Sequence, residues 1–247
     1  MNTLRPPPPA TERLAQASPD FEAKLRQAEE ALRTASRAHV AIKQASSLGA
    51  EDVVISHLIA RLGLPITVFV LDTGALHHQT LALLERQQAA ARLTIEVHRP
   101  DASQVIQWVA RHGQSAIYDR IESRKDCCRV RKLEPLARAL HGQTAWITGL
   151  RREQSDARAD VPLVDTSELE TLGRTKYNPL ANWTWGDVWH FVAQEQIDYN
   201  PLHDDFFPSI GCAPCTRAIS LGEPFRAGRW WWEDESAKEC GLHVRAA

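Results

Sequence analysis

The chain has 247 residues, of which 43% are hydrophobic and 24% are charged, and its 29 basic and 31 acidic side chains give a formal net charge of −2. This length is sufficient to bury a sizeable core, and the ordinary composition excludes wholesale disorder. The near-neutral charge provides no overall footprint for nucleic acid or an anionic membrane, so we expect neither as a partner. The five cysteines are an odd number, which excludes complete pairing in intramolecular disulfides.

The first residues are rich in proline, and residues 6–9 are all proline where a secretory signal would have its apolar run. We expect residues 1–19 to form a loose, disordered tail. No apolar run approaches the roughly 18 residues that a membrane helix needs. These features predict a cytoplasmic protein, and cysteines in that compartment serve metals or catalysis more often than disulfides.

Helical and strand patterns then alternate up to residue 148. The periodicity predicts helices over residues 21–39, 52–63, 77–92, 102–112 and 130–141. It predicts strands over residues 39–46, 66–71, 93–98 and 144–148. This rhythm is typical of an α/β fold with an open, mostly parallel sheet and helices on both faces. Ligands of such folds bind beyond the carboxyl ends of the strands.

The pattern becomes irregular after Leu150. Residues 151–181 are polar, and residues 185–194 predict one more helix with Thr184 as its N-cap. The remainder carries three of the five cysteines and a run of three tryptophans with little periodicity. We therefore expect an α/β domain over residues 20–216 and an irregular, mobile C-terminal segment over residues 217–247.

Two loops at predicted strand ends are suited to binding an anion. Small residues let backbone N–H groups approach an anion, and the helix that follows the first loop adds the positive end of its dipole. Each loop alone is also explained as an ordinary turn, but two at neighbouring strand ends reinforce each other. The residues are Ser46, Ser47, Gly49 and Asp52 in the first loop, and Leu71, Asp72, Thr73 and Gly74 in the second.

Four cysteines form two pairs. Cys127 and Cys128 are adjacent and precede a predicted helix, whereas Cys212 and Cys215 form a C-x-x-C motif. Four thiolates suit tetrahedral zinc or an iron–sulfur cluster. Neighbouring cysteines diverge and do not easily chelate one ion, whereas a wider cluster accepts ligands at different corners, so the spacing favours a 4Fe-4S cluster over zinc. Four unrelated core thiols are a weaker explanation, because paired cysteines rarely occur by accident.

Cys240 stands apart near the C-terminus, between Lys238 and His243. Basic neighbours would lower the pKa of its thiol and make it a nucleophile. Its position in a terminal tail, taken alone, favours a surface thiol of no consequence. Basic side chains also gather beside the strand ends and the cysteines, which indicates a small polyanionic ligand. These basic residues are Arg129, Arg131, Lys132, Arg151, Arg152, Arg158, Arg226 and Arg229.

Taken together, the strand-end loops, the two cysteine pairs, the basic residues and the region around Cys240 resemble the phosphoadenylyl-sulfate (PAPS) reductase family. Within that family, they resemble the assimilatory adenylyl-sulfate (APS) reductases of the iron–sulfur type. The resemblance runs in order through most of the chain, which makes it highly specific. It implies an adenine nucleotide α-hydrolase-like fold with a modified P-loop. The segments that carry it are residues 49–54, 71–74, 127–132, 149–155, 178–180, 199–203, 209–217, 228–233 and 238–243.

The resemblance implies that the enzyme reduces APS to sulfite and AMP, in assimilatory sulfate reduction and cysteine biosynthesis. Cys240 would attack the sulfur of APS, giving an S-sulfocysteine, and thioredoxin or a similar dithiol would release sulfite. The two cysteine pairs would hold one 4Fe-4S cluster per subunit, and Lys132 would link the cluster to the substrate. The first strand-end loop would hold the phosphosulfate and the second would line the nucleotide pocket. The arginines implied in neutralising the phosphosulfate are Arg158, Arg226 and Arg229, with Arg131 as a neighbour.

Other functions are compatible with parts of the pattern. A PAPS reductase or an enzyme that uses both substrates shares Cys240, but relatives that reduce PAPS lack the two cysteine pairs. A zinc- or cluster-binding interaction module explains the pairs but not Cys240 or the strand-end loops. An ATP pyrophosphatase or sulfurylase-like relative of the same fold would not need Cys240. Both a monomer and a homo-oligomer are compatible with the sequence.

Overall fold

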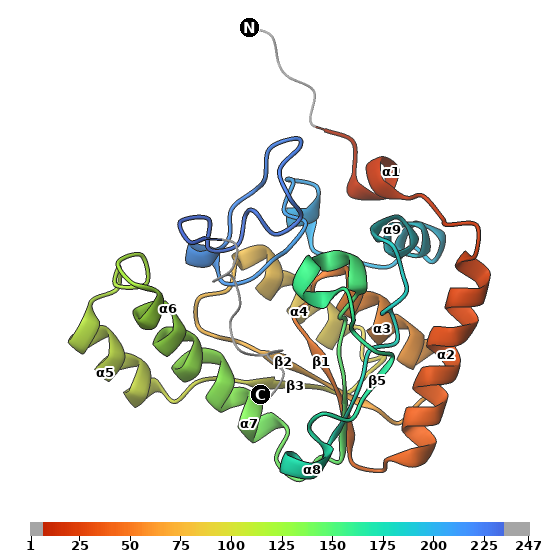
Figure 1. Ribbon diagram of the computed structural model, residues 1–247, viewed down its shortest axis with the longest axis horizontal. Coiled ribbons are helices and arrows are strands. Elements are labelled where there is room, and N and C mark those ends of the chain that lie inside the picture. The colour runs from red at the N-terminus through yellow and green to blue at the C-terminus, as the bar shows by residue number, and fades with distance from the viewer. Residues whose placement is uncertain (1–6, 235–247) are drawn as a thin grey trace, which may run out of the picture.

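A six-stranded sheet forms the centre of the computed structural model, which describes residues 7–234 (Figure 1). The sheet order is β3-β2-β1-β4-β6-β5, and only the β5–β6 pair is antiparallel. The predicted open, mostly parallel α/β sheet is therefore confirmed. The strands are β1 (Ile42–Ser46), β2 (Thr67–Leu71), β3 (Ile95–His98), β4 (Ala145–Ile147), β5 (Val164–Asp165) and β6 (Thr175–Tyr177).

Helices cover both faces of this sheet, with α5, α6 and α7 on the left in Figure 1 and α2, α3 and α9 on the right. The main core lies under the second group, and the opposite face is filled by a smaller cluster around Phe69 and Trp146. None of the helices within residues 7–234 is both long and apolar enough to span a membrane. The helices are α1 (Ala10–Leu14), α2 (Phe21–Ala38), α3 (Ala50–Arg61), α4 (His78–Ala89), α5 (Ala102–His112), α6 (Ile121–Cys128), α7 (Glu134–Ala139), α8 (Leu169–Leu172) and α9 (Trp185–Gln194).

The predicted helix over residues 130–141 is part of a longer helical run. Helix α6, a π-helical stretch (Arg129–Leu133) and α7 follow one another without a break. Cys127 and Cys128 therefore precede helical residues as predicted, but they also end a helix of their own, α6. The sequence analysis missed α6 because its residues are mostly polar and show no apolar period.

The polar stretch 151–181 also contains regular structure that the sequence analysis did not predict. Strand β6 pairs in parallel with β4, and all three of its residues are buried. Its central residue is Lys176, whose ammonium lies 3.0 Å from Glu168 and 5.1 Å from the centre of the Trp146 ring. A charged residue can occupy a central strand here because its charge is paired.

The expectation of a loose tail over residues 1–19 is wrong for the part that the structure describes. Ala10 in α1 is fully buried, and its backbone N–H donates to the Asp204 carboxylate at 2.7 Å. Further along, the N–H of Ser18 donates to Asp187 at 2.7 Å. The prolines end before α1 begins, so they do not prevent the following residues from docking.

Asp187 connects this N-terminal segment to α9. Its carboxylate caps the helix with Thr184 and lies 3.1 Å from the Lys24 ammonium. Burial alone would raise the pKa of Asp187, but the hydrogen bonds from Ser18, Thr184 and Lys24 outweigh it and lower the pKa to about 2. Because this pKa is lower than in the unfolded chain, the contacts stabilise the fold above about pH 4 and are lost as the pH falls toward 2.

We expect Asp187→Asn to lower the free energy of unfolding by about 2 kcal/mol at pH 7, and this difference to shrink as the pH approaches 2. Urea unfolding across this pH range measures it. The matched control is Glu22→Gln, at an exposed position on α2. A difference that does not change with pH would contradict the assigned role of the carboxylate.

Candidate functional site

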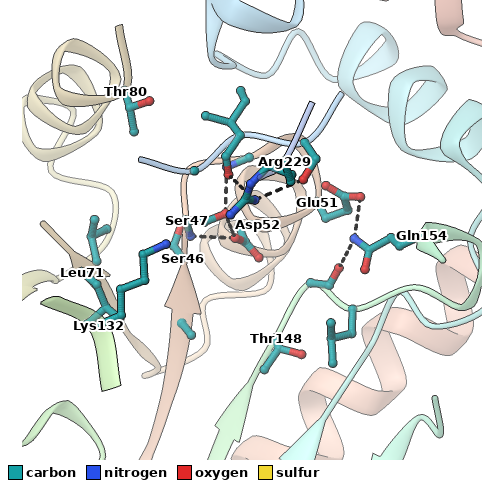
Figure 2. Close-up of a pocket in the computed structure, with 18 of the residues that line it drawn as sticks. Ser46, Ser47, Glu51, Asp52, Leu71, Thr80, Lys132, Thr148, Gln154 and Arg229 are labelled. Carbon is teal, nitrogen blue, oxygen red and sulfur yellow. Dashed lines mark hydrogen bonds between the residues drawn. The ribbon is translucent and has the colours of Figure 1, made fainter. Parts of the chain in front are cut away.

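A cavity of about 210 Å³ lies beyond the carboxyl ends of β1, β2 and β4 (Figure 2). The strand order reverses direction here, because β2 follows β1 on one side and β4 lies on the other. Such a switch point leaves a crevice between neighbouring loops, and ligands of open α/β sheets bind in it. The cavity is closed by segments from the last quarter of the chain, residues 203–211 and 225–230.

All four predicted residues of the first loop line this cavity. Asp52 pins the loop, because its carboxylate accepts from both the backbone N–H and the hydroxyl of Ser47 at 2.7 Å. Burial raises the pKa of Asp52 to about 6, against the opposing effect of these hydrogen bonds. Gly149 closes over the same carboxylate, and a Cβ at this position would collide with it.

The residues of the second loop have two roles: some line the cavity and others shape the turn. Leu71 and Thr73 line the cavity, whereas Asp72 and Gly74 do not. The Asp72 carboxylate instead shapes the turn, because it accepts from the Gly74 N–H at 3.0 Å and from Arg99 at 2.9 Å. The Thr73 hydroxyl lies 3.2 Å from the sulfur of Cys212, which connects this loop to the cysteines.

Four basic side chains and two acidic ones line the cavity. Lys132, Arg158, Arg226 and Arg229 reach it from three different segments, and in Figure 2 Lys132 points toward Ser46 and Ser47. The acids are Glu51 and Asp52. Arg131 does not line the cavity but lies behind the second loop, where it donates to the Thr73 carbonyl at 2.8 Å. The excess of basic side chains fits an anionic ligand.

Glu51 is held by partners at the cavity wall. Its carboxylate accepts from fully buried Arg151 at 3.0 Å. It also accepts from the Gln154 amide at 2.9 Å (Figure 2). Arg229 is also buried, and it donates to the Ser209 hydroxyl and the Ile210 carbonyl at 3.3 Å each. Its Nε is buried and has no hydrogen-bond partner among the described residues. An anion in the cavity would supply acceptors for this guanidinium.

The sequence analysis missed several lining residues. Thr148 follows β4 as Thr73 follows β2, so applying the strand-end rule to a third strand would have found it. The others were not assigned to the site, although Glu51 lies in the first loop and Gln154, His203 and Trp230 lie in segments that carry the family resemblance. They include Glu51, Trp146, Gln154, His203, Phe225 and Trp230.

Three of the paired cysteines, Cys127, Cys212 and Cys215, lie in one apolar cluster with Trp108, Val130 and Trp230, and Trp230 also lines the cavity. The charge of Cys128 acts on Cys215, so the two pairs lie near each other. All four thiols are free of disulfides, and three of them are buried. Burial raises the pKa of Cys127, and it raises the pKa of Cys215 to about 12. Within residues 7–234, no group of three or more His, Cys, Asp or Glu side chains is arranged to hold a metal ion.

A buried ion pair fixes the end of the described chain to α6. Glu233 accepts from Arg124 at 2.9 and 2.5 Å, and their side chains are 2% and 0% exposed. The Trp230 ring covers the guanidinium at 4.7 Å. Cys240, the predicted nucleophile, lies seven residues further on and outside the described residues.

Because removing one partner leaves a buried charge, we expect Glu233→Gln to lower the free energy of unfolding by about 3–5 kcal/mol. The control is Glu223→Gln, which breaks the partly exposed pair with Arg217. That change should cost less than about 1 kcal/mol. Equal losses for the two variants in urea unfolding would show that the Arg124–Glu233 pair has no special weight.

Comparison with known proteins places the fold and the site in context. The family model described as the phosphoadenosine phosphosulfate reductase domain matches residues 41–218. "Adenosine 5'-phosphosulfate reductase" of Allochromatium vinosum is 51% identical over 81% of this chain and 78% of its own length. The protein of the same name from Burkholderia cepacia is 47% identical over 92% of this chain and 90% of its own.

Solved structures agree on the fold. A PAPS reductase from Candida auris, in a phosphate complex, superposes with a TM-score of 0.65 at 24% identity, covering 83% of this chain and 98% of its own. An FMN adenylyltransferase from Candida glabrata superposes with a TM-score of 0.55 at 13% identity, covering 96% and 85%. The predicted adenine nucleotide α-hydrolase-like fold is thus confirmed. With the family model matching most of the chain and relatives near 50% identical, the chain belongs to the phosphoadenosine phosphosulfate reductase family.

Proposed function

We propose that this chain reduces APS to sulfite and AMP. The observation that carries the proposal is the cavity at the switch point, where four basic side chains and an anion-binding loop line one space beside four cysteines that form no disulfide. The names of the most similar relatives support the same activity. We place the reaction in the cytoplasm, in assimilatory sulfate reduction and cysteine biosynthesis.

The cavity suits APS because this substrate joins an adenosine to a compact, doubly charged phosphosulfate. The backbone around Ser47 and the start of α3 would receive the phosphosulfate, with Arg158, Arg226 and Arg229 neutralising its charge. Leu71 and Thr73 would line the nucleotide side. The assignment of this end to an anion rests on the excess of basic side chains.

The chemical step would use Cys240. Its thiolate attacks the sulfur of APS, a sulfur–sulfur bond forms, and the bond from sulfur to the phosphate oxygen breaks so that AMP leaves with the electron pair. One thiolate of a dithiol such as thioredoxin then attacks the Cys240 sulfur, sulfite leaves with the electron pair of the sulfur–sulfur bond, and a mixed disulfide forms. The second thiol of the dithiol attacks this mixed disulfide, which releases the Cys240 thiolate and leaves the dithiol oxidised to its disulfide. The ion pair with Arg124 fixes Glu233 beside α6. Because a chain of seven residues spans at most about 24 Å, Cys240 can act only within that distance of Glu233.

The four paired cysteines fit a 4Fe-4S cluster. None of them forms a disulfide, one pair ends α6 and the other lies at residues 212–215, and Cys127, Cys212 and Cys215 share an apolar cluster. The Thr73 hydroxyl, 3.2 Å from Cys212, would donate to a thiolate there. Such a cluster would connect the end of α6 to residues 212–215 and would add a local charge. Lys132 lines the cavity and its charge also acts on Cys127 and Cys215, so it would couple this charge to the substrate.

A PAPS reductase, or an enzyme using both substrates, remains the second candidate. The same loop and arginines would bind either phosphosulfate. The paired cysteines favour APS, because the resemblance associates them with the APS-reducing branch.

We expect the anaerobically purified protein to form sulfite from APS with thioredoxin, and to use PAPS far less well. Cys240→Ser should abolish sulfite formation while AMP binding stays unchanged, because this residue would react with sulfur without building the cavity. Mixing the wild-type chain with APS alone should add one SO3 group to Cys240, detected by intact mass and peptide mapping. Sulfite production by Cys240→Ser would remove Cys240 from the mechanism.

The anaerobic protein should also be brown and contain about four irons per chain, as four thiolate ligands imply. Cys215→Ser should lose iron and visible absorbance, whereas Cys240→Ser should keep both. Iron analysis and the absorption spectrum provide the measurements. A colourless wild-type protein containing zinc would contradict the cluster.

A further inference from the structure

The segment formed by residues 8–16, here called the N-terminal strap, lies outside the family match but contacts a wall of the cavity. Arg13 is its main contact. One nitrogen of its guanidinium, Nη2, donates to the carbonyls of both His203 and Asp204 at 3.0 Å. From Ala10, the backbone N–H donates to the Asp204 side chain at 2.7 Å. The strap thus holds both the backbone and a side chain of one turn.

The other end of the strap is fixed to α9. The N–H of Gln16 donates to the Gly186 carbonyl at 3.2 Å. A Cβ at residue 186 would collide with the Gln16 carbonyl, so the close approach requires glycine. The strap therefore bridges the start of α9 and the turn at residues 203–206.

This turn needs external support. Phe206 adopts a left-handed backbone with φ of 63°, which is unfavourable for a bulky residue. The Arg13 guanidinium lies 4.2 Å from the centre of the Phe206 ring. One arginine thus contacts the strained residue and two carbonyls just before it.

The same turn forms part of the cavity. His203 lines the cavity, and its ring is fixed by the Phe207 carbonyl at 2.7 Å and by Trp189, whose ring centre is 5.1 Å away. The chain then continues along the cavity through residues 208–211 and reaches Cys212. A shift of the turn would therefore move both His203 and the wall that follows it.

We infer that the N-terminal strap is a positioning element of the nucleotide site, with Arg13 holding the turn at residues 203–206 in its ligand-binding form. The identity of the nucleotide rests on the proposed function. Arg13 does not line the cavity, so it acts on the ligand only through this turn. A loss of its contacts should weaken binding of substrate and product alike, which raises KM and leaves kcat nearly unchanged.

The test compares Arg13→Met, which keeps the side-chain stem, with Arg13→Lys, which keeps a donor, in the full-length protein. We expect Arg13→Met to raise the Kd for AMP and the KM for APS about tenfold, because hydrogen bonds from a charged donor are lost. The kcat should stay within about twofold, and Arg13→Lys should recover part of the affinity. Arg26→Met, at an exposed position on α2, is the matched control.

Hydrogen exchange of residues 203–211 provides a second readout, with faster exchange expected in Arg13→Met while the rest of the sheet is unchanged. An Arg13→Met protein with lowered stability but wild-type Kd for AMP would overturn the inference and make the strap merely structural. A wild-type chain that binds AMP but does not reduce APS would contradict the proposed function instead, and the Kd comparison would still decide the role of the strap.

Discussion

The reversal of strand order between β1 and β4 is the constraint on which the rest of the structure depends. Parallel strands end at a common edge, and loops that leave β1 and β4 in opposite directions leave a gap between them. The helix α3 begins at this gap, so its N-terminus faces the cavity. The segments that cross over the gap later in the chain need only supply a cover and charge.

Burial of charge at this gap is tolerated because each buried charge has partners nearby. The Asp52 carboxylate accepts hydrogen bonds from Ser47. The Glu51 carboxylate accepts from Arg151 and Gln154. Both acids at the start of α3 are therefore engaged with neighbouring residues of the cavity wall, which limits their repulsion of an anion. Arg124 and Glu233 neutralise each other beside the cysteines. An isolated buried charge would cost several kcal/mol, so these pairs fix which side chains remain available to a ligand.

The sequence predicted the features that depend on local pattern. The apolar run at residues 66–71 predicts a strand from neighbouring residues alone, and the structure has β2 there. The first strand-end loop is recognised in the same way, and its predicted residues line the cavity. Helix α6 and strand β6 escaped prediction because their burial depends on paired polar side chains rather than on apolar periodicity. Arg13 contacts His203 and Asp204, which lie 190 and 191 positions later in the sequence. No local sequence pattern signals such a contact. Proline-rich surroundings even favoured the opposite expectation.

The wall at residues 203–211 is held from both ends of the chain. Arg13 fixes its beginning from the N-terminal side, and Arg229 fixes its end through Ser209 and Ile210. The two arginines differ in one respect, because Arg229 also lines the cavity whereas Arg13 does not. An anion bound by Arg229 would therefore act on the same wall that the strap supports. Since Arg229 contacts the wall at 3.3 Å, longer than a typical charged hydrogen bond, the anion and the wall can share its guanidinium, and the strap keeps the wall in place while they do.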